Sequence, residues 1–100
     1  MANEQQIEHE SRRYARTTVL WTGTLLCKEL QFECVIVNIS AGGALLRVEG
    51  ASACTSPVTV VNPRIGQLTG KIIWRKENEL GISFDDTPEA VAAAIGHALG

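Results

Sequence analysis

The sequence has no long apolar run, few aromatic residues and no excess of positive charge. No apolar run approaches the roughly 20 residues that a membrane-spanning helix needs, and the polar residues 1–10 do not resemble a secretory signal. Aromatic residues make up 5% of the chain, and the net charge is -2. Proteins that bind single-stranded nucleic acid usually interleave surface aromatics with basic residues. We therefore expect a cytoplasmic protein that binds neither a membrane nor a nucleic acid polymer.

Cysteine and histidine are also scarce, and their spacing matches no known kind of site. Cys27, Cys34 and Cys54 are an odd number without the close spacing of a disulfide framework. Cys27 and Cys34 could face each other across a hairpin, but we expect all three to be reduced and packed as small hydrophobes. No CxxC or HxxxH spacing occurs. The sequence thus predicts no metal, no cofactor and no catalytic residues, and the protein is not expected to be an enzyme.

The pattern that is present is that of a small all-β domain. Six short segments rich in β-branched and apolar residues, 17–26, 31–39, 44–48, 57–61, 65–74 and 80–84, are separated by turn residues. This spacing is typical of an antiparallel sandwich or barrel. Residues 1–11 have little apolar content and are predicted to be a flexible tail. The domain is expected to span residues 12–100, since 100 residues support one domain.

The last segment changes from strand to helix character. Thr87, Pro88 and Glu89 supply an N-cap, a proline at the first helical position and an acid in the first turn. The apolar residues that follow at helical spacing are Val91, Ile95, Ala98 and Leu99. The sequence predicts a helix over about 87–99 that packs on the barrel.

Two motifs point to a function. The first is RxxxR, in the sequence Arg12-Arg13-Tyr14-Ala15-Arg16, where the tail meets the first strand. The second is NxSxxG, over residues 38–43, at the turn between the second and third strands. Together with Trp74 and the segment 81–84, these motifs resemble the PilZ domain family of bacteria. The resemblance extends from about residue 12 to the C-terminal helix, and in the family aspartate is the usual residue where this chain has asparagine.

The resemblance implies a six-stranded antiparallel β-barrel, with a C-terminal helix, that binds cyclic di-GMP across the outside of one end. Arg12 and Arg16 match the motif positions and would bind phosphate and guanine, because a guanidinium donates two parallel hydrogen bonds. Arg13 would support them. A second basic group, Lys71, Arg75 and Lys76, lies outside the motifs and is a local patch of the kind that a small anionic ligand needs.

The remaining candidates lie on the turn and on the fifth strand. Asn38 would accept from guanine N–H groups and Ser40 would bond a base or a phosphate. Gly43 would allow close approach of the ligand or a positive φ. The alternative for these three residues is a plain hairpin turn, since all are turn formers. Trp74 either lies against the ligand or packs on the barrel wall.

The expected function is a cyclic di-GMP receptor whose N-terminal arginines order over the barrel on binding. The resulting surface would be recognised by an unidentified downstream protein, and the receptor would be a monomer or a dimer linked by the ligand. The alternative is a PilZ-like docking module that binds proteins without nucleotide.

Overall fold

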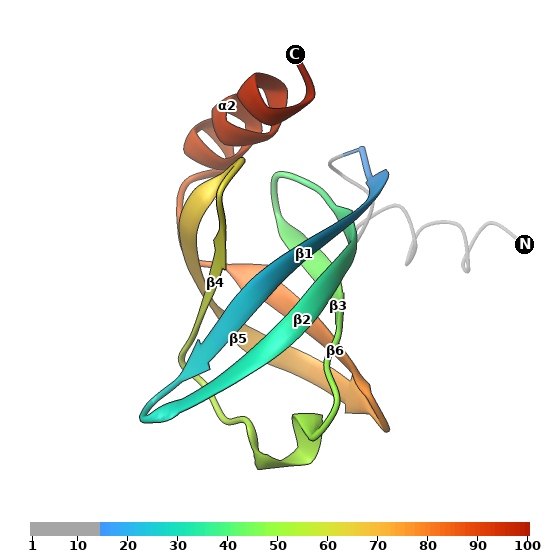
Figure 1. The fold of residues 1–100 in the computed structure, drawn as a ribbon. Coiled ribbons are helices and arrows are strands. Elements are labelled where there is room, and N and C mark those ends of the chain that lie inside the picture. Colours follow the sequence, from blue (N-terminus) through green and yellow to red (C-terminus); the bar gives the residue numbers. More distant parts are fainter. Residues whose placement is uncertain (1–14) are drawn as a thin grey trace, which may run out of the picture.

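The computed structural model describes residues 15–100, which form a closed barrel of six antiparallel strands with a helix at one end (Figure 1). The elements are β1 (Thr17–Cys27), β2 (Leu30–Ile39), β3 (Gly43–Arg47), the 3₁₀ turn η1 (Ala51–Ala53), β4 (Val58–Asn62), β5 (Gly66–Lys76), β6 (Glu79–Phe84) and α2 (Pro88–Leu99). Around the barrel the strands follow the order β1-β2-β3-β6-β5-β4. The predicted six-stranded antiparallel barrel is confirmed.

The core follows from the alternation of side chains along each strand. In β4, Val58, Val60 and Asn62 are buried. Val61, which lies between two of them, is only half-buried. In β6, Leu80 and Ile82 point inward. Because every strand contributes alternate apolar residues to one interior, the outer face of the barrel remains free for a ligand.

The regular alternation is interrupted by bulges in three strands. The register shifts between Thr18 and Trp21 in β1, between Ile36 and Asn38 in β2, and between Ile72 and Trp74 in β5. A bulge adds one residue to a strand and reverses the facing of every residue after it. These shifts decide which side chains reach the outer surface near the β2–β3 turn.

The cysteine prediction was wrong in part. A disulfide joins Cys27, the last residue of β1, to Cys54, just after η1, with 5.6 Å between the Cα atoms. The two residues are 27 positions apart, and they meet because the barrel brings the end of β1 beside the start of β4, where Cys27 pairs with Val58. Cys34 is a free, buried thiol whose pKa burial raises to about 11; it lies opposite Gly23 and not opposite Cys27.

The expected C-terminal helix is present as α2, beside the end of the barrel where β4 finishes (Figure 1). The Thr87 hydroxyl accepts a hydrogen bond from the Ala90 N–H at 3.2 Å and so caps the first turn. Val91 is fully buried, whereas Leu99, expected on the same face, is 53% exposed because it lies in the last turn. No helix within residues 15–100 is long and apolar enough to cross a membrane.

Candidate functional site

The turn between β2 and β3 is held by hydrogen bonds within the NxSxxG motif. The backbone N–H of Ser40 donates to the Gly43 carbonyl at 2.8 Å. The Ser40 hydroxyl accepts from the Gly42 N–H at 3.2 Å and donates to the Gly43 carbonyl at 3.4 Å. Ser40 is 6% exposed, so its side chain first of all fixes the shape of the turn.

Gly43 is required by the neighbouring strand. Its φ is not positive, so the expected left-handed turn geometry is absent at this position. A Cβ on Gly43 would overlap the carbonyl oxygen of Ile82 in β6. The Phe84 N–H donates to the Gly42 carbonyl at 2.9 Å and ties the turn to the same strand. The glycine therefore lets β3 approach β6 closely, whereas the sequence had suggested close approach of a ligand.

One row of register partners crosses four strands on the outer face. Asn38 in β2 pairs with Leu45 in β3, Leu45 pairs with Gly81 in β6, and Gly81 pairs with Trp74 in β5. Neighbouring strands lie about 4.8 Å apart, so Asn38 and Trp74 stand roughly 14 Å from each other. A Cβ on Gly81 would overlap the Trp74 indole, which therefore lies over the glycine while Trp74 stays 44% exposed. Trp74 thus packs on the barrel wall and still offers a ring surface to solvent.

A second row lies beside the first. Gly43 pairs with Ser83, and Ser83 pairs with Lys71 in β5. We call the surface formed by these two rows the outer platform. It has a floor on β3 and β6 and a border on β5. The floor is Gly43, Leu45, Gly81 and Ser83, and the border on β5 is Lys71 and Trp74. Gly43 and Ser83 are small, whereas Gly81 is covered by the Trp74 indole, so a ligand could approach the backbone closely at Gly43 and Ser83 only.

Arg16 lies just before β1, the strand that pairs with β2. Arg16 is exposed and directly precedes Thr17, which pairs with Ile39; Thr18 pairs with Asn38. This register places the Arg16 backbone at the level of the β2–β3 turn. Arg12 and Arg13 lie outside the described residues.

The second basic group of the sequence is divided by the fold. Lys71 borders the platform and has its ammonium 3.9 Å from a carboxylate oxygen of Asp85. Arg75 donates to the carbonyls of Ala51 and Ser52 at 3.2 Å each, so it anchors the η1 segment. Lys76 lies at the β5–β6 hairpin, opposite Glu79. Three neighbouring cations in the sequence therefore have three different surroundings.

Comparison with protein families connects this arrangement to a known domain. The family described as PilZ domain matches residues 10–99. The chain belongs to the PilZ family. PilZ domains generally bind cyclic di-GMP, and they are binding modules rather than enzymes. A comparison with curated proteins gave no match.

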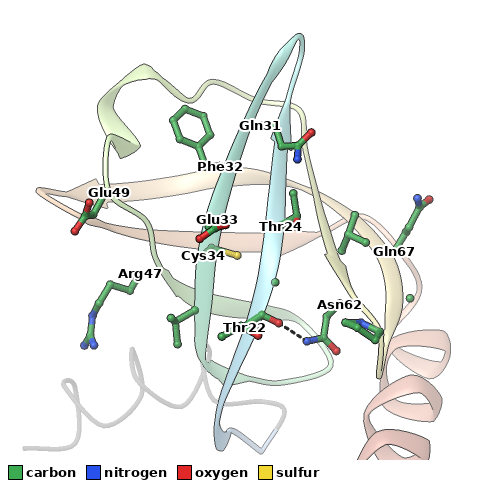
Figure 2. Close-up of a pocket in the computed structure, with 15 residues that line it drawn as sticks. Thr22, Thr24, Gln31, Phe32, Glu33, Cys34, Arg47, Glu49, Asn62 and Gln67 are labelled. Carbon is green, nitrogen blue, oxygen red and sulfur yellow. Dashed lines mark hydrogen bonds between the residues drawn. The ribbon is translucent and has the colours of Figure 1, made fainter.

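This PilZ domain also has a hollow of about 1250 Å³ that is lined mainly by residues of β1, β2 and β4 and by no residue of the platform (Figure 2). One side is formed by Asn62, whose side-chain amide donates to the Thr22 carbonyl at 2.6 Å. The charged residues around it are Glu33, Arg47 and Glu49. Because acids outnumber bases there, the hollow does not suit an anionic nucleotide. Its lining shares no residue with the predicted site.

Of the predicted site residues, Asn38 and Trp74 belong to one row of register partners, Gly43 belongs to the adjacent row, and Arg16 precedes the β1 residues that pair with Ile39 and Asn38. Ser40 lies in the turn, with its side chain bonded to Gly42 and Gly43. Ser83 and Lys71 were not among the site residues predicted from the sequence. In the sequence these two residues are an ordinary serine and an ordinary lysine within predicted strands. Only the register between β5, β6 and β3 places them beside Gly43. Within residues 15–100, no group of three or more acidic, cysteine or histidine side chains could hold a metal ion.

Proposed function

We propose that this PilZ domain is a receptor for cyclic di-GMP, which it binds across the outer platform. The proposal is supported by one observation: the register places Asn38 and Trp74 in one row on the outer face, Gly43 and Ser83 in the adjacent row, and the start of β1, which follows Arg16, beside Asn38. Cyclic di-GMP has two planar guanine bases and two negatively charged phosphates. A platform with cations at two borders and an exposed indole matches that chemistry.

The arginines supply charge and bidentate hydrogen bonds. Arg12 and Arg16 bind phosphate oxygens and the O6 and N7 acceptors of guanine, and Arg13 supports them. Each charge-assisted hydrogen bond is worth about 1.5–3 kcal/mol. The RxxxR motif is thus the largest source of affinity in this proposal.

The residues on the barrel orient the ligand. Asn38 accepts from guanine N–H groups, and a guanine stacks on the exposed face of Trp74. Ser40 and Gly43 act mainly by shaping the turn, since the Ser40 hydroxyl is already bonded to Gly42 and Gly43. The hydroxyl keeps an accepting lone pair for a guanine N–H or N2 amine of the ligand.

Ligand binding then changes the surface of the domain. The segment with Arg12 and Arg13 becomes fixed over the β2–β3 turn, and ligand, segment and barrel together form a surface that a partner protein recognises. NMR relaxation of residues 1–15 tests this step. If these amides show the same relaxation with and without saturating ligand, the ordering mechanism is wrong.

The decisive experiment is calorimetric titration of the full chain with cyclic di-GMP, using GTP and cyclic AMP as controls. We expect micromolar or tighter binding by the wild type. The double variant Arg12→Ala/Arg16→Ala should bind at least about 100-fold more weakly, because two charge-assisted contacts are lost. Arg64→Ala is the matched control, since Arg64 stacks on Trp21 at 5.5 Å and lies outside the platform.

A docking module without nucleotide is the second candidate function. It is favoured by the exposed apolar side chains on β5, where Ile73 is 62% exposed beside Trp74. Exposed neighbouring apolar residues are typical of protein contacts. A folded wild type that gives no heat with cyclic di-GMP would reject the receptor proposal in favour of this one.

A further inference from the structure

Lys71 is the cation of the outer platform that no sequence motif includes. It lies on β5 opposite Ser83, and Ser83 lies opposite Gly43 of the NxSxxG turn. Its side chain is 64% exposed, and its ammonium is 3.9 Å from Asp85. An exposed pair at this distance contributes little stability. The ammonium can therefore exchange Asp85 for a ligand atom at small cost.

The bulge in β5 gives Lys71 and Trp74 a common face. Ile72, between them, packs against the core, and Ile73 is the extra residue of the bulge. Without the bulge, residues 71 and 74 would point to opposite faces, because strand side chains alternate. A base stacked on the Trp74 indole would thus lie within reach of the flexible Lys71 side chain.

The chemistry of this position distinguishes guanine from adenine. A lysine ammonium only donates hydrogen bonds, and guanine presents the two acceptors O6 and N7 on one edge. Adenine has an N6 amino group in place of O6, so it would set a donor against the ammonium. A cation beside a base-stacking ring therefore favours guanine.

We infer that Lys71 binds the O6/N7 edge of the guanine that stacks on Trp74, and so determines the specificity of the site for guanine over adenine. The inference rests on the proposed function, because it needs a cyclic dinucleotide on the platform. In this arrangement Lys71 contacts the guanine on Trp74, and the RxxxR arginines bind the phosphates and the other guanine. Selection of the base that stacks on Trp74 then depends on β5.

The test compares cyclic di-GMP with cyclic di-AMP on wild type, Lys71→Met and Lys76→Met. Methionine keeps an unbranched apolar stem and removes the charge, and Lys76 is an exposed lysine of the same strand near the hairpin. Affinities are measured by displacement of a fluorescent cyclic di-GMP analogue, which also quantifies weak binding. Lys71→Met should lose roughly tenfold in affinity for cyclic di-GMP and change little for cyclic di-AMP. Lys76→Met should match the wild type.

The outcomes separate this inference from the proposed function. Wild-type binding with unchanged affinity in Lys71→Met overturns the role of Lys71 and leaves the receptor proposal intact. An equal loss for both dinucleotides also overturns it, because it would place the ammonium on a phosphate. Absence of cyclic di-GMP binding by the wild type overturns the proposed function and the inference together.

Discussion

The two ends of the barrel are held by different interactions. At the end that carries η1, the disulfide between Cys27 and Cys54 joins β1 to the segment before β4. Arg75 binds two carbonyls of η1, and Ser56 accepts from the Ile72 N–H at 2.8 Å. At the end that carries the β2–β3 turn, the bonds are short-range contacts within residues 40–43 and one backbone bond to β6.

This difference separates stability from binding. The η1 end contains a covalent link and side-chain bonds to the backbone, which serve stability. The turn end has glycines, a bulge in β2 and the exposed Arg16, and it is the end to which we assign binding. β5 takes part in both regions, since Arg75 anchors η1 while Trp74 borders the platform. Changes at the two ends should therefore affect different measurements.

Loss of the disulfide should have the largest effect on stability. The double variant Cys27→Ser/Cys54→Ser opens a link across 27 positions. Closure of a loop of that length contributes about 3.5 kcal/mol to the free energy of unfolding in the chain-entropy model. Urea denaturation measures the loss. Affinity for cyclic di-GMP should stay within about twofold of wild type at a temperature where the variant is folded, because distant independent sites act additively.

Cys34→Ala is the control for the disulfide variant. It removes the buried thiol that takes no part in the link, and should cost about 1 kcal/mol through a small cavity. Equal destabilisation by the two variants would contradict a disulfide between Cys27 and Cys54. A large loss of ligand affinity in the double variant would show that the two ends are coupled.

Gly43→Ala should destabilise the turn end by an intermediate amount. The added Cβ overlaps the Ile82 carbonyl oxygen, so β3 must move away from β6. Overpacking of this kind costs about 1–3 kcal/mol. Urea denaturation gives the loss in stability, and calorimetry should show weaker cyclic di-GMP binding in the same variant.

Gly96→Ala is the matched glycine control. Gly96 lies inside α2 with no atom near the position of an added Cβ. Alanine should stabilise the helix by about 0.5–1 kcal/mol, because glycine is a poor helix former. If Gly43→Ala were as harmless as Gly96→Ala, the close approach of β3 to β6 would not be needed.

Asn38→Asp should have the smallest effect, and it should strengthen binding. A carboxylate accepts from guanine N1–H and the N2 amine together, whereas the amide has one accepting oxygen. The gain of a charge-assisted bond over a neutral one is about 1 kcal/mol, or roughly fivefold in affinity. Calorimetry at constant salt measures the change. Weaker binding by Asn38→Asp would place Asn38 beside a phosphate instead of a guanine.

Much of the fold could be predicted from the sequence because strands and turns are local. The alternating apolar segments gave six strands close to the observed bounds, and Thr87-Pro88 marked the start of α2. The disulfide was missed because the pairing of Cys27 with Cys54 depends on strand order around a closed barrel. Composition and spacing carry no information about that order.

The candidate site was predicted as a set of residues, and its geometry was not. The two motifs and Trp74 could be identified along the chain. Strict alternation from buried Ile36 would have turned Asn38 inward, and strict alternation from exposed Lys71 would have turned Trp74 inward. The bulges in β2 and β5 turn both residues outward.

The sequence by itself thus determined the strands, the turn, the C-terminal helix and the motif residues, because these depend on neighbours within a few positions. Only the tertiary structure decided that Cys27 meets Cys54, that Gly43 faces a carbonyl of β6, and that Lys71 joins the platform. Each of these contacts depends on the register between strands distant in the sequence, and a shift of one residue would reverse the face of every side chain involved.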